Sequence, residues 1–275
     1  MCVLVPRAAM LVCSLTFGAA MTQRWPDTLW LVRHGESAGN IARDAAYAAG
    51  VSVIDIAERD VDVPLSPAGE KQADALGRWY AGMAPSERPS VVLVSPYLRA
   101  RHTAALIQAA GGVEPSAPIL IDERLREKEF GILDRLTKTG IEQRFPEQAA
   151  ARARMGKFYF RPPGGESWCD VILRLRSVLD TLSLHHRQPG TRVLVVAHQV
   201  IVLCMRYLLE GLDEEQILAI DRGGDVANCG VTTYELNHAL EAEGALELRA
   251  YNFVAPLEDA GAPVTTKRDL PAGAR

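Results

Sequence analysis

The clearest pattern in the chain is three short apolar runs, each bounded by polar or turn-forming residues. They cover residues 29–32, 91–94 and 192–197. Apolar runs of this length, without polar alternation, are typical of strands buried on both faces of a parallel sheet. Segments with apolar residues at helical spacing separate them. The pattern therefore predicts an α/β fold, a three-layer α/β/α sandwich with a mostly parallel central sheet.

The segments between these runs carry the signals of helices. Ser66 followed by Pro67 is typical of a helix start, because serine caps the first turn and proline fits the first helical position. Two segments near the C-terminus have the residue types of antiparallel edge strands. Helices are predicted over residues 36–49, from 67 onward, and over 97–110, 166–186 and 200–209, and further strands over 119–121, 231–236 and 247–253.

One domain over residues 27–255 accounts for these elements, and no linker demands a second domain. The pattern is irregular from 122 to 163, apart from a basic, alanine-rich helix near 148–154. Long irregular segments inside a compact domain are commonly active-site lids. We therefore predict an inserted lid at about residues 132–163.

The two ends of the chain are predicted to lie outside this domain. Residues 1–26 form a leader, in which the stretch 8–20 has the shape of a secretory signal, with small residues at the cleavage point. The alternative is a mis-assigned start, with Met21 as the true first residue. Residues 256–275 are rich in Pro, Gly, Ala and charge, which predicts a disordered tail.

Composition narrows the class of protein. The net charge of −4 argues against a general nucleic-acid or membrane-surface binder. The five cysteines are scattered and form no CxxC pair, so they indicate reduced thiols and not a disulfide framework or a zinc site. We expect a cytoplasmic protein with no nucleic-acid or membrane partner, and the signal-like leader leaves export open.

The first apolar run ends in Arg33, His34 and Gly35. In open α/β sheets, ligands bind at the carboxyl ends of the strands. Gly35 lets the backbone approach a ligand closely, and a helix that begins near Ser37 adds N–H groups at the same point. An arginine, an imidazole and a helix N-terminus together predict a phosphate site.

Further motifs follow the other strands, and together they resemble a known family, the histidine phosphatase superfamily, also called phosphoglycerate-mutase-like. The resemblance extends from about residue 28 to about residue 236. The motifs are, in chain order, Arg33-His34-Gly35, Ser95-Pro96 followed by Arg99, Glu127 in a Leu-x-Glu-x-x-aromatic-Gly frame, and His198-Gln199.

The resemblance implies roles for these residues. His34 is the nucleophile, which attacks phosphorus and forms a phosphohistidine. Arg33, Arg99 and His198 meet the negative charge of the transferring phosphoryl group, so that no metal and no other cofactor is implied. Asn40 donates an amide hydrogen bond to the phosphate.

The leaving group needs an acid, because an alkoxide leaves poorly until it is protonated. The resemblance assigns that role to Glu127, which can then activate water against the phosphohistidine. Glu129 is the rival carboxylate. The implied function is a metal-independent phosphomonoesterase for small phosphorylated metabolites, with a phosphoglycerate mutase or a fructose-2,6-bisphosphatase-type activity as the alternative.

The lid and the His-Gln pair are similar to the fructose-2,6-bisphosphatase branch. In that branch an Arg and a Lys of the lid bind the second phosphate of the sugar, and Arg152 and Lys157 match them with one extra residue between. Gln199 also matches. Lys138 stands where the branch has a tyrosine, and Leu203 stands where it has an arginine. We therefore expect a small phosphorylated substrate with a second anionic group, and a homodimer is left open.

Three other classes of protein are compatible with parts of the chain. Residues 35–39 satisfy the G-x-S-x-G pattern of a serine hydrolase, with Ser37 as its nucleophile. That pattern normally follows several strands, and here it follows the first. A metal hydrolase that uses His34 and His198 lacks the usual ligand spacing. A non-enzymatic binding module of the same fold would usually have lost a catalytic residue, and none is missing here.

Overall fold

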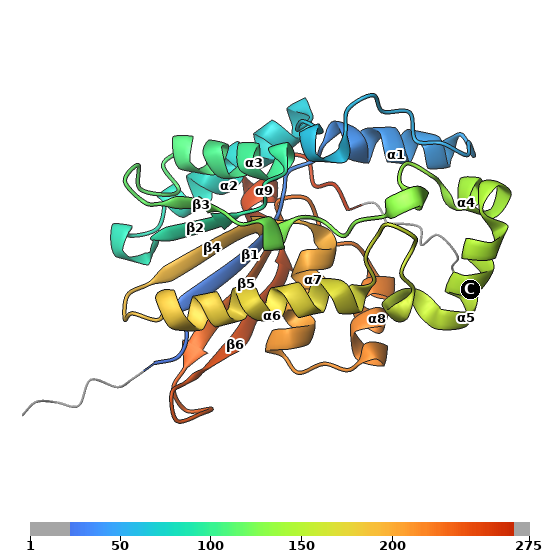
Figure 1. Cartoon of the computed structure of the whole chain (residues 1–275). Helices are drawn as coiled ribbons and strands as arrows, with labels where there is room; N and C mark the ends of the chain where they lie inside the picture. Colours follow the sequence, from blue (N-terminus) through green and yellow to red (C-terminus); the bar gives the residue numbers. More distant parts are fainter. Residues whose placement is uncertain (1–22, 267–275) are drawn as a thin grey trace, which may run out of the picture.

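The computed structural model describes residues 23–266, which form a twisted sheet between two layers of helices (Figure 1). The sheet has the strand order β3-β2-β4-β1-β5-β6. Strands β3, β2, β4 and β1 are parallel, β5 is antiparallel to β1, and β6 is antiparallel to β5. The strands are β1 (Thr28–Arg33), β2 (Val91–Val94), β3 (Ile119–Ile121), β4 (Arg192–Ala197), β5 (Val231–Asn237) and β6 (Ala245–Phe253).

Each face of the sheet has its own apolar core. Leu29 and Leu31 of β1 point to one face, and Trp30 and Val32 point to the other. Helices α6 and α7 cover the first face, whereas α2, α3 and α9 cover the second (Figure 1). The predicted three-layer sandwich is therefore confirmed. The α-helices are α1 (Ala38–Ala48), α2 (Pro67–Ala81), α3 (Leu98–Ala109), α4 (Lys138–Arg144), α5 (Pro146–Tyr159), α6 (Trp168–His185), α7 (Gln199–Leu209), α8 (Glu214–Gly223) and α9 (Ala255–Asp259).

The pairing of β1 with β4 is the feature that positions the site. The two strands are parallel and in register, and Arg33 at the end of β1 is paired with Ala197 at the end of β4. The backbone N–H of His34 donates to the carbonyl of Ala197 at 2.9 Å. Because both strands end at the same edge of the sheet, the residues that follow them, His34 and His198, become neighbours.

Two elements differ from the sequence prediction. The segment 231–236 was expected at the edge of the sheet, but β5 lies between β1 and β6, and β6 forms that edge. Its residues Val231 and Tyr234 are fully buried, as an inner strand requires. Helix α8 was not expected. Between residues 23 and 266, no helix is long and apolar enough to cross a membrane.

The prediction of a disordered tail from residue 256 is wrong for residues 256–266. Leu257 of α9 is buried in the core beside α2, and the chain then returns towards the carboxyl end of β1. There the hydroxyl of Thr265 accepts from Gln72 and donates to Asn228, each at 2.9 Å. Residues 267–275 and the leader up to residue 22 lie outside the described residues. Residues before the predicted domain boundary at 27 pack against the domain, because Gln23 is buried and donates to Asp27 at 2.9 Å.

The predicted lid corresponds to α4 and α5, at one end of the molecule (Figure 1). The basic, alanine-rich segment lies in α5, as predicted. The lid has a small apolar cluster of its own, built from Leu133, Ile141 and Phe160. The lid is therefore a packed substructure near the carboxyl ends of the parallel strands and not an irregular loop.

Candidate active site

His34 lies directly after β1 and is 4% exposed. Its ring Nδ1 lies 2.7 Å from the carbonyl oxygen of Gly35, and the Nε–H of Arg99 donates to its Nε2 at 3.3 Å. The carbonyl can only accept, so Nδ1 carries the proton and Nε2 carries the lone pair. Gly35 is required at this turn, because a Cβ there would lie 2.5 Å from the backbone oxygen of Gly69.

The surroundings of His34 keep its ring neutral. Burial lowers the pKa of His34 well below its usual value, and the positive charges of Arg99 and Arg33 lower it further. A neutral imidazole with a protonated Nδ1 presents a nucleophilic Nε2. This is the protonation state that attack on phosphorus requires.

The two arginines assigned to the phosphate are both buried beside His34. Arg33 ends β1, and Arg99 lies in the first turn of α3. The guanidinium of Arg99 also lies over the ring of Tyr97, at 4.8 Å from the ring centroid. Two guanidinium groups beside one imidazole concentrate positive charge there, which makes the position favourable for the oxygens of a phosphoryl group.

His198 lies directly behind His34, with 5.1 Å between the ring centroids. It follows β4 and is completely buried. Its Nε2 lies 2.7 Å from the hydroxyl of Ser95, whereas Nδ1 has no hydrogen-bond partner within residues 23–266. Sequence reasoning missed the role of Ser95, which orients the ring, although the Ser-Pro motif contained it. The ring does not line the cavity in front of His34.

The structure separates the two candidate acids. Glu127 lines the cavity that His34 lines, and Glu129 does not. Glu129 is exposed and accepts a hydrogen bond from the hydroxyl of Tyr97 at 2.9 Å. Burial of the Glu127 carboxyl group raises its pKa to about 7, although the N–H of Lys128 donates to it and opposes the shift. A carboxyl group with this pKa can hold a proton at neutral pH.

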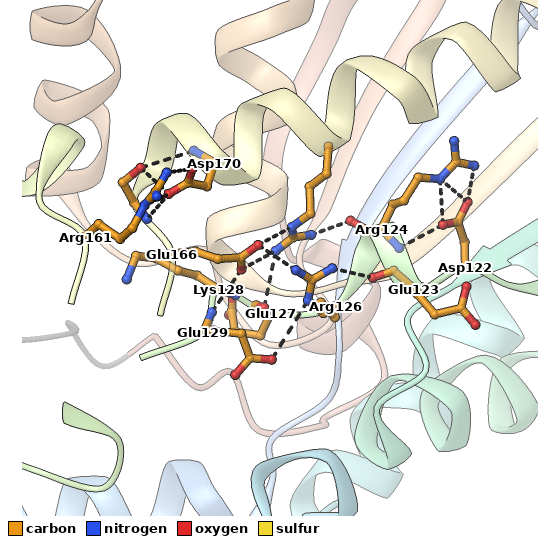
Figure 2. Close-up of polar contacts among 12 residues, drawn as sticks. Asp122, Glu123, Arg124, Arg126, Glu127, Lys128, Glu129, Arg161, Glu166 and Asp170 are labelled. Carbon is orange, nitrogen blue, oxygen red and sulfur yellow. Dashed lines mark hydrogen bonds and ion pairs between the residues drawn. The ribbon is translucent and has the colours of Figure 1, made fainter. Parts of the chain in front are cut away.

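A network of ion pairs holds the segment that carries Glu127 (Figure 2). Glu166 binds Arg126 at 2.7 Å and Arg174 at 2.9 Å, and it accepts from the backbone N–H of Glu129. Arg174 also donates to the backbone carbonyl of Glu127. Arg174 of α6 and Glu166, which lies just before α6, thus hold the backbone at Glu127 and Glu129.

The cavity in front of His34 has a volume of about 270 Å³ and extends from the sheet edge to the lid. All four residues predicted to bind substrate line it: Asn40, Gln199, Arg152 and Lys157. The carbonyl oxygen of Asn40 accepts from the N–H of Ser37 at 3.0 Å, which leaves the amide N–H groups to donate. The side chain of Gln199 donates to Asp225 at 3.0 Å.

The two lid cations differ in their surroundings. The ammonium of Lys157 is paired with Asp221 at 2.6 Å, whereas Arg152 has no ion pair with any residue in 23–266. The sequence did not indicate a third cation, Lys128, which is 9% exposed and lines the same cavity over the ring of Phe130. Burial lowers the pKa of Lys128 to about 8, and the charge of Arg152 contributes.

The geometry does not favour the other chemistries. Ser37 is the N-cap of α1, and its hydroxyl is bonded to the backbone and side chain of Asn40. A capping serine is not held against a base. In the described part of the chain, no group of three or more His, Cys, Asp or Glu side chains is placed to hold a metal ion.

Comparison with known proteins agrees with this geometry. A profile of the histidine phosphatase superfamily (branch 1) matches residues 29–243. The chain belongs to this superfamily. The match begins in β1 and ends beyond β5, so the histidine phosphatase domain includes every strand that borders the site.

Several relatives of this chain carry different names. The probable phosphoglycerate mutase GpmB of Photorhabdus laumondii is 29% identical over 77% of this chain and 86% of its own. A probable fructose-2,6-bisphosphatase of Schizosaccharomyces pombe is 30% identical over 69% of this chain and 40% of its own. Among solved structures, YhfR of Bacillus stearothermophilus has a TM-score of 0.63 and 25% identity, and the match covers 84% of this chain and 98% of that protein. The superfamily thus includes both phosphatases and mutases that resemble this chain.

Proposed function

We propose that this protein is a metal-independent phosphomonoesterase that acts on small phosphorylated metabolites through a phosphohistidine intermediate. The observation that carries the proposal is His34: a buried, neutral imidazole whose Nε2 lone pair faces the guanidinium of Arg99. A nucleophile and a cation on the same phosphoryl site are what phosphoryl transfer to an enzyme requires.

The proposed reaction has two steps. Nε2 of His34 attacks phosphorus in line, the bond from phosphorus to the ester oxygen breaks, and Glu127 transfers its proton to that oxygen, which leaves as an alcohol. Arg33 and Arg99 meet the charge on the phosphoryl oxygens. The carboxylate of Glu127 then takes a proton from water, whose oxygen attacks the phosphohistidine. His34 leaves as a neutral ring, and inorganic phosphate is released.

A phosphoglycerate mutase is the second candidate, because a relative that matches most of this chain carries that name. The two activities differ in the fate of the phosphohistidine: a mutase returns the phosphoryl group to the bound product, whereas a phosphatase gives it to water. The test is a screen of phosphorylated metabolites with purified protein, including 3-phosphoglycerate, sugar phosphates and fructose 2,6-bisphosphate. Release of inorganic phosphate supports the phosphatase. Interconversion of 2- and 3-phosphoglycerate without release would identify a mutase.

Activity is expected to survive chelation of metal ions. In the proposed reaction the positive charge comes from the buried Arg33 and Arg99, which perform the role of a metal ion at the phosphoryl oxygens. The measurement is phosphate release before and after dialysis against EDTA. Loss of activity on chelation, with recovery on Zn²⁺ or Mg²⁺, would refute the mechanism as written.

The lid cations are expected to select substrates with a second anionic group. A hydrogen bond from a partly buried cation to phosphate contributes about 1.5–3 kcal/mol, or roughly 10- to 150-fold in affinity. Arg152→Ala should therefore raise KM for a doubly anionic substrate by that factor. Lys157→Ala should have a smaller effect, because Asp221 already pairs with the ammonium.

The matched measurement uses p-nitrophenyl phosphate, which has no second anion, and on which both variants should behave like the unchanged protein. Arg154→Ala is the control variant, since Arg154 lies on the same helix but is exposed and does not line the cavity. Equal effects of Arg152→Ala on both substrates would show that the residue stabilises the fold or adds to the overall positive potential of the site. It would then not bind the second anionic group of the substrate.

A further inference from the structure

A carboxylate lies against the phosphate-binding arginine. Asp60 begins the short 3-10 helix η1 (Asp60–Asp62), in the segment between α1 and α2, and lines the cavity in front of His34. Its Oδ1 accepts from Nη1 of Arg99 at 3.0 Å, and its Oδ2 accepts from Nη2 at 3.3 Å. The two oxygens therefore meet the guanidinium side by side, in the geometry that a phosphoryl group would use.

Asp60 and His34 together engage most of the donors of Arg99. A guanidinium has five N–H donors. The Nε–H goes to His34, both Nη1–H groups go to the carbonyl and the carboxylate of Asp60, and Nη2 gives one more to the carboxylate. A phosphoryl group held by Arg99 needs the outward donors that the carboxylate occupies. It is also an anion, so the two cannot share the guanidinium without mutual repulsion.

Asp60 is the member of this pair that is free to move. The side chain of Arg99 is 6% exposed, whereas that of Asp60 is 45% exposed. Among residues 23–266, the Asp60 carboxylate has no hydrogen-bond partner other than Arg99. The backbone carbonyl of Asp60 also accepts from Arg99, so the turn can stay in place while the carboxylate rotates away.

We propose that Asp60 is an internal competitor for the phosphoryl site: its carboxylate leaves Arg99 when the phosphoryl group of the substrate binds, and returns when inorganic phosphate departs. This rests on the proposed function, since it assigns Arg99 to the phosphoryl group. The competition lowers the affinity of the site for every phosphate, the product included. The apparent affinity scales with the fraction of molecules in which the carboxylate has left Arg99. The competition thereby favours release of inorganic phosphate after each turnover.

The test is Asp60→Asn, which keeps the shape of the side chain and removes its charge. Hydrogen bonds between charged groups are about twice as strong as neutral ones, so the variant should bind inorganic phosphate about 10- to 100-fold more tightly. Isothermal titration with inorganic phosphate, and with orthovanadate, measures this without turnover. KM for a phosphate ester should fall with it, and the rate of a single phosphorylation at saturating substrate should change little.

Asp62→Asn is the matched control. Asp62 lies in the same turn and loses the same charge, but it pairs with Arg59 at 2.6 Å and does not line the cavity. It should leave the affinity for phosphate unchanged. Asp60→Ala should act in the same direction as Asp60→Asn, which separates the removal of charge from any new contact of the amide.

Equal or weaker phosphate binding by Asp60→Asn would overturn the proposal, because the carboxylate would then serve only to position Arg99. An equal gain in Asp62→Asn would overturn it too, since the effect would be one of general charge. A different result would contradict the proposed function, namely the absence of a phosphohistidine in the unchanged protein. Phosphate binding that is undetectable in both the unchanged protein and Asp60→Asn would contradict both.

Discussion

Replacing His34 with alanine is expected to lower kcat on the order of 10⁴- to 10⁶-fold, the loss typical of a covalent nucleophile that acts with its partners as a unit. In the proposed reaction Nε2 of His34 accepts the phosphoryl group, and the neighbouring imidazole of His198 is not placed to take over that role. His198 lies 5.1 Å behind it and is bonded to Ser95. The variant should therefore neither turn over substrate nor become labelled.

The measurement follows the intermediate itself. Phosphoryl-labelled substrate should label the unchanged protein during turnover, and the label should be lost in acid, because phosphohistidine is acid-labile. His102→Ala is the control, since His102 lies on α3 and does not line the cavity. An acid-stable label that disappears in Ser37→Ala, or reaction of Ser37 with a fluorophosphonate probe, would instead support a serine hydrolase.

Glu127→Gln is expected to lower kcat by about 10²- to 10⁴-fold, the usual contribution of a positioned general acid. The loss should be greatest on alkyl phosphates and smaller on p-nitrophenyl phosphate, whose leaving group needs a proton less. Glu129→Gln is the control, because that side chain is exposed and lies outside the cavity. Equal losses on both substrates would contradict the role of Glu127 as the acid.

The pKa of Glu127 fixes the direction of the pH dependence. The first step needs the protonated acid, and burial raises its pKa to about 7. The rate of phosphorylation of the unchanged protein should therefore fall as pH rises through about 7, measured as the burst with an alkyl phosphate. In Glu127→Gln that fall should vanish, because the amide does not titrate. A fall at the same pH in the variant would assign the titration to another group.

The same shift predicts an effect on stability. Because the folded-state pKa of Glu127 lies above its unfolded value of 4.5, ionisation opposes folding once pH exceeds 4.5, and the cost is complete above about 7. The difference corresponds to about 3 kcal/mol. Glu127→Gln should therefore unfold at a higher urea concentration than the unchanged protein at pH 8, and at a similar one at pH 4.5.

The sequence predicts those residues of this site that lie at the carboxyl ends of strands. His34 and His198 each follow an apolar run, and the ends of neighbouring parallel strands meet at one edge. The family resemblance pairs the two histidines, and the structure supplies the physical reason, which is that β1 and β4 are neighbours. The resemblance favours Glu127 over Glu129, but the physical distinction needed the structure, because the two carboxylates are two residues apart and only Glu127 lines the cavity.

Contacts between distant segments could not be predicted from the sequence. Asp60 lies in a polar stretch without periodicity, 39 residues before Arg99, and nothing local marks it as a partner. The C-terminal segment has the composition of a tail, yet the burial of Leu257 against α2 orders it. Local propensity describes how a segment behaves alone, and tertiary packing decided both cases.

The contacts of Thr265 can form only at the end of synthesis of the chain. Thr265 bonds to Gln72 and Asn228, which in turn bond to the backbone of Glu36 and His34. A nascent chain leaves the ribosome with its N-terminus first, and Thr265 follows Gln72 by 193 residues. The loop that carries His34 is therefore synthesised early, and its contacts through Thr265 form late. During translation, a chain with its whole sheet already formed would still lack this support of the loop that carries His34.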